Sequence, residues 1–260
     1  MIELDRVTRQ FVTPDGGIYC TLRDVSLTVA AGSFVAIVGP SGCGKSTLLN
    51  IVAGLMLPSS GRVAIGGREL VGLNRRATYM FQQDALLPWK NVRENVALGL
   101  VLAGASRAEA NGRADGWLSR VGLQPFAAHY PAQLSGGMRK RVTMAQNWII
   151  DRDIVLMDEP FSALDVHTRQ RMETELLDLW DASKKTIVFV THDLEEAIAL
   201  ADEVVVLSAG PESHVVARHP VTLDRPRDLM ELRTSPGFTE LYRSIWAVLR
   251  DEVIKSQRHA

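Results

Sequence analysis

The sequence predicts an α/β fold, in which buried parallel strands alternate with helices. Short apolar runs at 34–39, 153–159, 186–192 and 203–208 are typical of strands that are buried on both faces of a sheet. Longer segments with helical periodicity separate these runs, as the crossovers between parallel strands require. The chain has 260 residues, of which 46% are hydrophobic and 23% charged, so it is large enough to bury a substantial core.

The middle of the chain, from about 88 to 150, predicts a helical insertion in this α/β domain. Asn91 stands three positions before Glu94, and Ser106 three positions before Glu109, which is the spacing that starts a helix. No convincing strand pattern interrupts this region. It is therefore expected to fold as helices.

The C-terminal stretch 235–253 predicts an amphipathic helix, because its apolar residues recur at helical spacing. An apolar stripe of this kind packs on the body of its own domain or forms a surface for a partner, and the first is the commoner case. The apolar positions are Phe238, Leu241, Tyr242, Ile245, Leu249 and Val253.

Charge and cysteine content exclude several classes of protein. The 29 Lys and Arg residues are balanced by 30 Asp and Glu residues, so bulk electrostatics predict no nucleic acid partner, and any phosphate site must be local. Cys20 and Cys43 are too few for a disulfide framework or a zinc cluster, which indicates a reduced intracellular protein. We expect no signal peptide, and no run of about 18 apolar residues predicts a membrane span.

The stretch "GPSGCGKST" at 39–47 is the most specific motif of the chain. It matches G-x-x-x-x-G-K-[ST] between a strand candidate and a helical run, which is the context that a phosphate-binding loop requires. Its glycines let backbone N–H groups curl around phosphates, while Lys45 reaches the β and γ oxygens and the Ser46 hydroxyl can ligate Mg²⁺. A glycine-rich turn before a helix is the alternative reading. The candidate nucleotide-binding residues are Gly39, Pro40, Ser41, Gly42, Cys43, Gly44, Lys45, Ser46 and Thr47.

Two acidic residues end the strand candidate "IVLMDEP". Asp158 is expected to emerge at the carboxyl edge of the sheet, where it can hold Mg²⁺ beside the phosphate loop. Glu159 is the candidate general base for the attacking water. Gln82 and His192 close two further strand candidates, "ATYMFQ" and "TIVFVTH", at the same expected edge. The alternative interpretation is that the two acids are ordinary solvated residues at a strand end, and that Gln82 and His192 are surface residues or satisfied core residues.

Taken together, these motifs resemble those of the ATP-binding subunits of ABC transporters. The phosphate loop, the glutamine of "FQQDALLPW", the signature "LSGGM", and the motifs "LMDEP", "SALD" and "THD" occur in the family's order over about 39–193. The resemblance implies a P-loop NTPase fold with a RecA-like core, an inserted α-helical subdomain and an N-terminal antiparallel β portion. The implied ranges within the single domain 1–260 are a core of about 1–87 and 151–215, a helical signature subdomain of about 88–150, and a C-terminal helical tail of about 216–260.

The resemblance also implies how the signature works. Ser135 would start a helix whose N-terminus points at the γ-phosphate of ATP on a second subunit, because free N–H groups and the helix dipole favour an anion. Gly136 and Gly137 would permit close backbone approach. This arrangement is a head-to-tail dimer of two copies with two ATP molecules in its interface.

Further roles follow from the same resemblance. Gln82 would sense Mg²⁺ and water, Asp165 would communicate across the interface, and His192 would contact the γ-phosphate. The implied metal ligands are Ser46, Gln82 and Asp158. An aromatic residue near the N-terminus would stack on adenine, and Phe11 is preferred to Tyr19 for this position.

Two residues depart from the family pattern. Met138 stands where the commonest signature has Gln, and Gln146 stands where many relatives carry Arg. Neither position supplies a phosphate-binding group, so ATP hydrolysis is still predicted.

Three details resemble the importer branch that serves nitrate, sulfonates and taurine: "LLPW", the Met in the signature, and a short tail with "RPRDL". A groove bordered by 82–95 would then receive a helix of a separate membrane permease, while a solute-binding protein delivers cargo. Trp89 is either an apolar anchor in that groove or a buried structural residue. The subunit would lie peripherally on the cytoplasmic face of the inner membrane.

Two other functions compete with transport. One is a soluble ABC-type ATPase that acts on ribosomes, DNA repair or Fe–S assembly, against which stand the single cassette and the lack of basic surplus. The other is a regulatory nucleotide-binding module with little turnover, against which stands Glu159. The transported solute is not expected to touch this chain.

Overall fold

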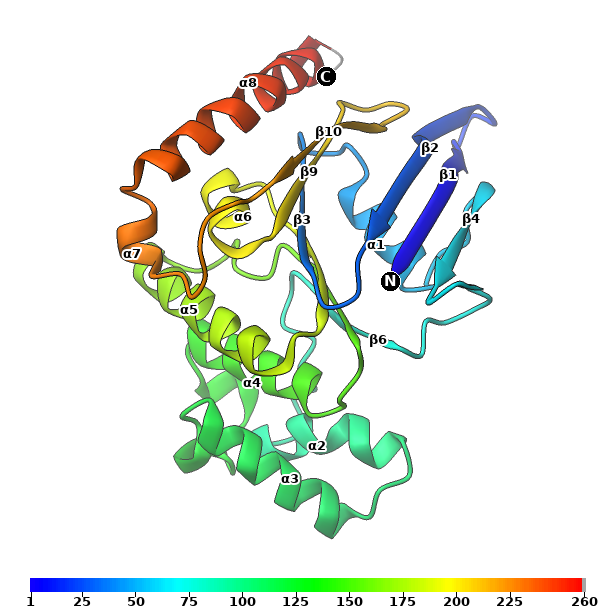
Figure 1. Cartoon of the computed structure of the whole chain (residues 1–260). Coiled ribbons are helices and arrows are strands. Elements are labelled where there is room, and N and C mark those ends of the chain that lie inside the picture. Colours follow the sequence, from blue (N-terminus) through cyan, green and yellow to red (C-terminus); the bar gives the residue numbers. More distant parts are fainter. Residues whose placement is uncertain (259–260) are drawn as a thin grey trace.

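The computed structural model describes residues 1–258 and consists of two β-sheets, covering helices and a separate group of helices (Figure 1). The last two residues of the predicted tail lie outside the described residues. The strands are β1 (Ile2–Val12), β2 (Ile18–Val29), β3 (Phe34–Val38), β4 (Ser60–Ile65), β5 (Arg68–Glu69), β6 (Ala77–Met80), β7 (Ile154–Asp158), β8 (Thr186–Val190), β9 (Glu203–Leu207) and β10 (Val215–Pro220). The α-helices are α1 (Lys45–Val52), α2 (Val92–Leu102), α3 (Arg107–Arg120), α4 (Gly136–Trp148), α5 (Val166–Ser183), α6 (Leu194–Leu200), α7 (Leu229–Leu232) and α8 (Pro236–Arg258), with short 3₁₀ turns at Gln124–Phe126 and Pro131–Gln133.

The central sheet has six strands in the order β10-β9-β3-β8-β7-β6. All pairs from β9 to β6 are parallel, and only β10 runs antiparallel at the edge. The four apolar runs that predicted buried strands form β3, β7, β8 and β9, so the predicted α/β class is confirmed. The runs are apolar at nearly every position because helices and a second sheet cover the two faces of this sheet.

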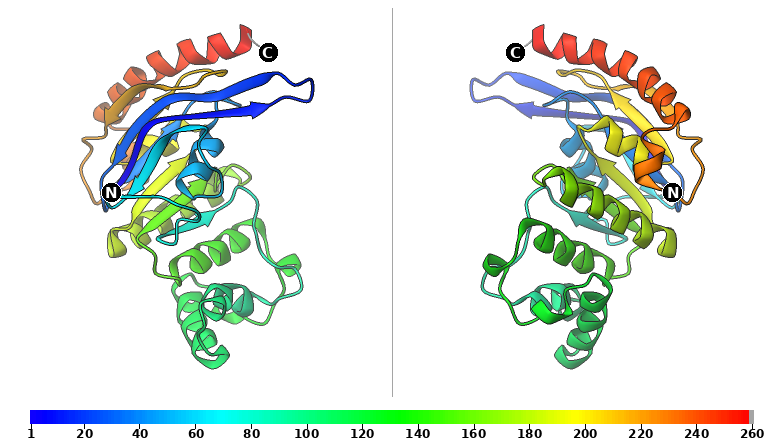
Figure 2. Two further views of the ribbon diagram at one scale, coloured as in Figure 1. Left: turned by 90° about the vertical axis from the view of Figure 1, so that its right-hand side faces the viewer. Right: turned by 90° about the vertical axis from the view of Figure 1, so that its left-hand side faces the viewer.

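The second sheet is antiparallel, with the order β2-β1-β4-β5. Its long β1 and β2 strands project as a hairpin over the rest of the molecule (Figure 2). Helix α1 is buried in one apolar cluster with residues of this sheet and of the central sheet, including Leu4, Leu27, Leu49 and Ile37. This packing fixes the start of α1, and with it the phosphate loop, against β1 and β2.

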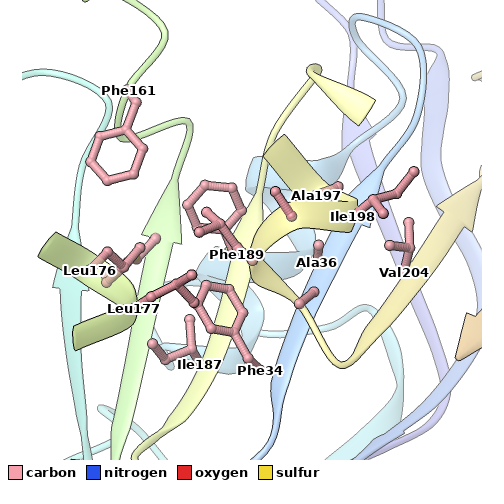
Figure 3. Close-up of a cluster of buried hydrophobic side chains, with 14 of the residues drawn as sticks. Phe34, Ala36, Phe161, Leu176, Leu177, Ile187, Phe189, Ala197, Ile198 and Val204 are labelled. Carbon is pink, nitrogen blue, oxygen red and sulfur yellow. The ribbon is translucent and has the colours of Figure 1, made fainter. Parts of the chain in front are cut away.

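The opposite face of the central sheet carries α5, α6 and α8. Phe34 on β3 and Phe189 on β8 lie with their ring centroids 5.8 Å apart, and Leu176 and Leu177 of α5 cover them (Figure 3). The predicted C-terminal helix is confirmed as α8, whose Phe238 and Ile245 are buried in this same cluster. Its apolar stripe thus packs on the body of the domain.

Helices α2, α3 and α4 form a separate core at the far end of the molecule (Figures 1 and 2). The predicted helix starts are confirmed: Asn91 caps α2 in a capping box with Glu94, and the Ser106 side chain accepts a hydrogen bond from the N–H of Glu109 at the start of α3. Within 1–258, no helix is long and apolar enough to cross a membrane.

One segment differs from the prediction. The range 216–260 is predicted as a helical tail, but its first residues belong to β10, which pairs with β9. Half-buried and exposed residues alternate along β10, as they do on an edge strand with one covered face. The helical part of the tail begins only at Leu229.

Candidate nucleotide site

The strands of the central sheet bring the predicted site residues to one edge. The phosphate loop follows β3, Gln82 follows β6, Asp158 ends β7, and His192 follows β8. These four strands are consecutive and parallel, so their carboxyl ends meet along the same edge. Asp158 is paired in register with Val190, the last residue of β8. His192 follows two residues after Val190 and therefore lies close to the end of β7.

The phosphate loop is held tightly before α1 begins. Gly44 has a φ of 93°, and a Cβ atom there would lie 2.8 Å from Thr21, so this position requires glycine. The Lys45 Nζ is buried and donates hydrogen bonds to the carbonyls of Gly39 (2.9 Å) and Pro40 (3.0 Å). Lys45 therefore lies inside the curve of the loop, where its charge faces any bound phosphate.

A hollow of about 330 Å³ opens above the loop. The first N–H groups of α1 and the Lys45 ammonium make it attractive to an anion, while Glu159 provides a carboxylate at its rim. Cys43 is buried and is not part of its lining, and burial raises the pKa of the Cys43 thiol. The lining residues are Tyr19, Thr21, Ser41, Gly42, Gly44, Lys45, Ser46, Thr47 and Glu159.

Oxygen atoms suited to a hard cation gather beside the loop. The Ser46 hydroxyl donates to Asp158 Oδ1 at 2.9 Å, and the Tyr79 hydroxyl donates to Oδ2 at 3.3 Å. Burial raises the pKa of the Asp158 carboxyl, and the hydrogen bonds from Ser46 and Tyr79 act against this rise. The sequence did not single out Tyr79; its place on β6 next to β7 was the signal that could have done so.

Glu159 and His192 are in direct contact. His192 Nδ1 lies 2.9 Å from Glu159 Oε2, and because a carboxylate only accepts hydrogen bonds, Nδ1 donates. The Glu159 backbone is left-handed, with a φ of 43°, and its N–H donates to the carbonyl of Val190 at 2.9 Å. A non-glycine residue held in this region is strained, and such strain gathers at functional sites.

Gln82, at the same edge of the sheet, makes only a long contact with its neighbour. Its Nε2 lies 3.5 Å from the Ser162 hydroxyl, at the limit of a hydrogen bond, and Ser162 in turn donates to the carbonyl of Glu159 at 3.1 Å. The side chain of Gln82 is exposed. Ser162 is a further residue that the sequence did not single out.

Behind His192 lies a buried carboxyl that the sequence did not single out. Glu196 on α6 is hydrogen-bonded to the Thr191 hydroxyl and is almost fully buried. Burial raises the pKa of Glu196 to about 8; the Thr191 hydrogen bond opposes this rise, Glu173 and Asp193 add to it, and Arg169 opposes it. Glu196 therefore supports the segment before His192 as a neutral acid at pH 7.

The signature lies apart from this edge. Ser135 is exposed and caps α4 by accepting a hydrogen bond from the N–H of Met138 at 3.3 Å, so the predicted helix start is confirmed. A Cβ atom at Gly137 would lie 2.7 Å from Thr168, so glycine lets α4 approach α5. Asp165 caps α5 through the N–H of Thr168, a contact that lowers the pKa of Asp165. Residues 135–137 do not line the hollow above the phosphate loop.

The two aromatic candidates for adenine are cross-strand partners. Phe11 on β1 is paired with Tyr19 on β2. Tyr19 lines the hollow above the phosphate loop, whereas Phe11 is half-buried with the Arg9 guanidinium 4.6 Å from the centre of its ring. Both rings are thus within the same hairpin, and the preference for Phe11 stays a prediction.

Comparison with known proteins identifies the class. The model of the ABC transporter family matches residues 22–162, and the chain belongs to this family. It is 43% identical over 98% of its length to an uncharacterized ABC transporter ATP-binding protein of Methanocaldococcus jannaschii, of which the match covers 93%. The taurine import ATP-binding protein TauB of Pseudomonas aeruginosa is 45% identical over 86% of both chains. The nitrate import ATP-binding protein NrtC of Synechococcus elongatus is 38% identical over 96% of this chain, which covers 38% of that longer protein.

Solved structures agree with this assignment. The dimeric cassette MJ0796 is 34% identical and superimposes with a TM-score of 0.76 over 86% of this chain and all of that chain. A second structure of MJ0796, described as a post-hydrolysis state bound to ADP and Pi, superimposes with a TM-score of 0.75 over the same 86% of this chain at the same 34% identity. The protein is thus an ATP-binding cassette that hydrolyses ATP, and the predicted family, fold and ATPase activity are confirmed.

The assignment of Glu159 as general base has a direct test. The substitution Glu159→Gln keeps the shape of the side chain but removes its basicity, so we expect ATP to bind as before and hydrolysis to fall by about a hundredfold to ten thousandfold. Calorimetric titration with ATP and a phosphate-release assay measure the two effects. Turnover equal to that of the unsubstituted chain would show that another group is the base.

The buried Glu196 predicts a pH dependence of stability. The folded chain holds this proton up to a pH of about 8, whereas the unfolded chain releases it above the ordinary pKa of 4.5. Between these values the folded state binds more protons, so the free energy of unfolding should fall as pH rises, by up to roughly 1 kcal/mol per pH unit. Urea unfolding between pH 6 and 9 should show a flatter profile for Glu196→Gln than for the unsubstituted chain. Glu195→Gln, at an exposed neighbouring position, is the control and should leave the slope unchanged.

The adenine assignment is tested by a pair of substitutions. If the base stacks on Phe11, Phe11→Ala should weaken ATP binding by about tenfold, in the range of other aromatic stacking contacts to bases. Tyr19→Ala should weaken it less, because Tyr19 then contacts only the edge of the nucleotide. Calorimetric titration measures both affinities, and the reverse order would assign the stacking role to Tyr19.

Proposed function

We propose that this cassette is the ATP-hydrolysing subunit of an ABC importer that energises uptake of a small solute through a separate membrane permease. The relatives named for taurine and nitrate import support a solute such as nitrate, a sulfonate or taurine. The observation that carries the proposal is a second surface, distinct from the nucleotide site: an apolar groove between the central sheet and the helices α2 and α4.

The residues at the sheet edge fit ATP with Mg²⁺. Ser46, Asp158 and the exposed Gln82 provide oxygen ligands of the kind that Mg²⁺ prefers, and Ser46 and Asp158 already lie in contact. When bound, Mg²⁺ would neutralise charge on the β and γ phosphates. Lys45 would hold the same phosphates, Glu159 would accept a proton from the attacking water, and His192 would keep Glu159 oriented through their 2.9 Å contact.

The exposed signature supports a head-to-tail dimer of two copies. The free N–H groups at the start of α4 favour an anion, yet Ser135 lies away from the hollow above the phosphate loop of its own chain. A second copy could bring its ATP to Ser135, Gly136 and Gly137. Asp165 would lie beside that interface, because both it and Gly137 contact Thr168. The dimeric MJ0796 cassette supports the same assembly.

The groove has the character of a docking site for a permease helix. Its volume is about 560 Å³, and its walls come from the core, at Leu73 and Tyr79, and from the helical part, at Leu98, Leu102 and Ile150. An exposed apolar cleft of this size calls for an apolar partner. Gln146, where many relatives carry Arg, also lines it, so this departure from the family pattern falls on the proposed interface.

Trp89 is part of the exposed surface rather than the core. Its side chain is 71% exposed, so the interpretation as a buried structural residue is wrong. Trp89 does not line the groove itself, whereas Ala85 of the same segment does. It remains a candidate anchor for a permease that extends beyond the groove.

The remaining parts of the proposal follow from this docking. A permease partner would place the subunit peripherally on the cytoplasmic face of the inner membrane, and a solute-binding protein would deliver the cargo on the other side. The alternative, an ATPase acting on ribosomes, DNA repair or Fe–S assembly, is not favoured by relatives named for solute import. Glu159, in contact with His192, argues against a module without turnover.

A matched pair of substitutions tests the docking groove. Leu102 lines the groove and is 79% exposed, while Met230 on α7 is 68% exposed and lies outside it. Leu102→Glu should abolish copurification of a membrane permease and leave ATP binding intact, because a charge opposes burial of an apolar helix. Met230→Glu should have no effect on copurification.

The partner itself is identified from the native cell. The tagged protein is recovered from gently solubilised membranes, and the copurifying proteins are identified by mass spectrometry. A multi-spanning permease with a solute-binding protein is the expected result, and ligand screening of that binding protein would name the solute. Recovery with ribosomes, DNA or assembly factors alone would overturn the transport role while leaving the ATPase activity standing.

A further inference from the structure

Asp84 joins the segment after Gln82 to the helix that carries the signature. Its Oδ1 lies 2.9 Å from Lys140 Nζ, and its Oδ2 accepts a hydrogen bond from Arg139 Nε at 3.1 Å. Lys140 also donates to the backbone carbonyl of Gln82 at 2.8 Å. We refer to Asp84, Arg139 and Lys140 as the Asp84 clamp.

The other end of the clamp reaches the signature. Arg139 Nη1 donates to the carbonyl of Leu134 at 2.7 Å, and Leu134 directly precedes Ser135. Asp84 thus lies two residues after Gln82 in the chain. Through Arg139 it is also connected to the carbonyl of the residue before Ser135. Two parts of the nucleotide machinery that are about fifty residues apart in sequence are joined by three side chains.

Lys140 is the buried member of the clamp, whereas Asp84 and Arg139 are partly exposed. Lys140 is only 3% exposed, and a buried ammonium is costly unless it is paired and hydrogen-bonded. A neutral side chain would fill this site at lower cost, so the stability of the fold does not by itself account for a lysine here. The Lys140 ammonium, paired with the Asp84 carboxylate and hydrogen-bonded to the carbonyl of Gln82, instead holds the 82–84 backbone against α4.

The far end of the same segment is held independently. Asn95 on α2 is fully buried and accepts a hydrogen bond from the N–H of Leu87 at 2.8 Å. Its side-chain NH₂ lies within 3.1 Å of the carbonyls of Leu87, Lys90 and Asn91, to which its two hydrogens can donate. The stretch from Gln82 to Lys90 is therefore attached to the helical group at both ends. Gln82 itself lies between the two parts, two residues after β6 and hydrogen-bonded to Lys140 of α4.

We propose that the Asp84 clamp couples the two ATP sites of the dimer, with Asp84 as a positioning residue. Through Lys140 it sets Gln82 in the site of its own chain, and through Arg139 it sets Ser135, which serves the site of the other chain. The inference rests on the head-to-tail dimer of the proposed function. The clamp touches no reacting atom, so its loss changes the rate of hydrolysis and leaves ATP affinity nearly unchanged.

A double-mutant cycle tests whether the clamp acts as a unit. Asp84→Asn is nearly isosteric and Lys140→Met keeps the length of the stem; each is expected to lower kcat by about tenfold to a hundredfold while the Kd for ATP changes less than about twofold. The double variant should be no slower than either single variant, because residues of one unit are not additive. Multiplying effects, or a Kd that rises as much as kcat falls, would overturn the proposal.

The helical group offers a matched control. Asp115 on α3 pairs with Arg93 on α2 at 2.6 Å, and neither of these two helices carries a residue of the Asp84 clamp. Asp115→Asn should leave kcat and the Kd for ATP unchanged. An equal loss of kcat in Asp115→Asn and Asp84→Asn would reduce the clamp to a general contribution to folding.

Mixed dimers separate this inference from the proposed function. Full-length chains with two different affinity tags are combined, one of them carrying Glu159→Gln, so that the measured turnover comes from the site of the unsubstituted chain. Adding Ser135→Arg to the Glu159→Gln chain should abolish this turnover; if it does not, the shared site fails, and the coupling proposal fails with it. Adding Asp84→Asn instead should lower the turnover by about tenfold or more. If Ser135→Arg acts and Asp84→Asn does not, the dimer stands and only the role of the clamp is overturned.

Discussion

The parallel pairing of β3, β8, β7 and β6 is the constraint on which the rest of this structure depends. Because the strands run in one direction, four loops that are distant in sequence end at one edge of the sheet. The register of β7 with β8 sets Asp158 opposite Val190, so that Glu159 reaches His192 and Asp158 reaches Ser46. Strand pairing therefore decides which side chains of the site come within contact distance of one another.

The positions of the side chains at the sheet edge also affect the pKa values of two carboxyl groups. Burial at the sheet edge raises the pKa of Asp158, and hydrogen bonds from the Ser46 and Tyr79 hydroxyls act against this rise. Burial raises the pKa of Glu196 on α6 to about 8, so this carboxyl keeps its proton at neutral pH although Arg169 opposes the rise. Asp158 and Glu196 thus differ in their surroundings: Asp158 accepts hydrogen bonds from two hydroxyls, whereas Glu196 is almost fully buried.

The helical group adds a second constraint, because it is joined to the sheet edge through the segment 82–90. Asn95 holds the end of this segment near Leu87, and Lys140 holds its start at Gln82. The apolar groove also lies between the central sheet and the helical group. A helix bound in that groove would contact both sides of the joint, so a partner there has a physical route to the position of Gln82 and of the signature.

Elements whose signals are local could be predicted from the sequence. The phosphate loop, the caps at Asn91, Ser106 and Ser135, and the apolar strands could be predicted because each depends on residues within a few positions of one another. Only the tertiary structure decided which side chains meet across these elements. Strand order, register and helix packing bring together residues that no short-range pattern connects. They decide the contacts of Tyr79 with Asp158 and of Lys140 with Gln82, the burial of Glu196 behind His192, and the exposure of Trp89.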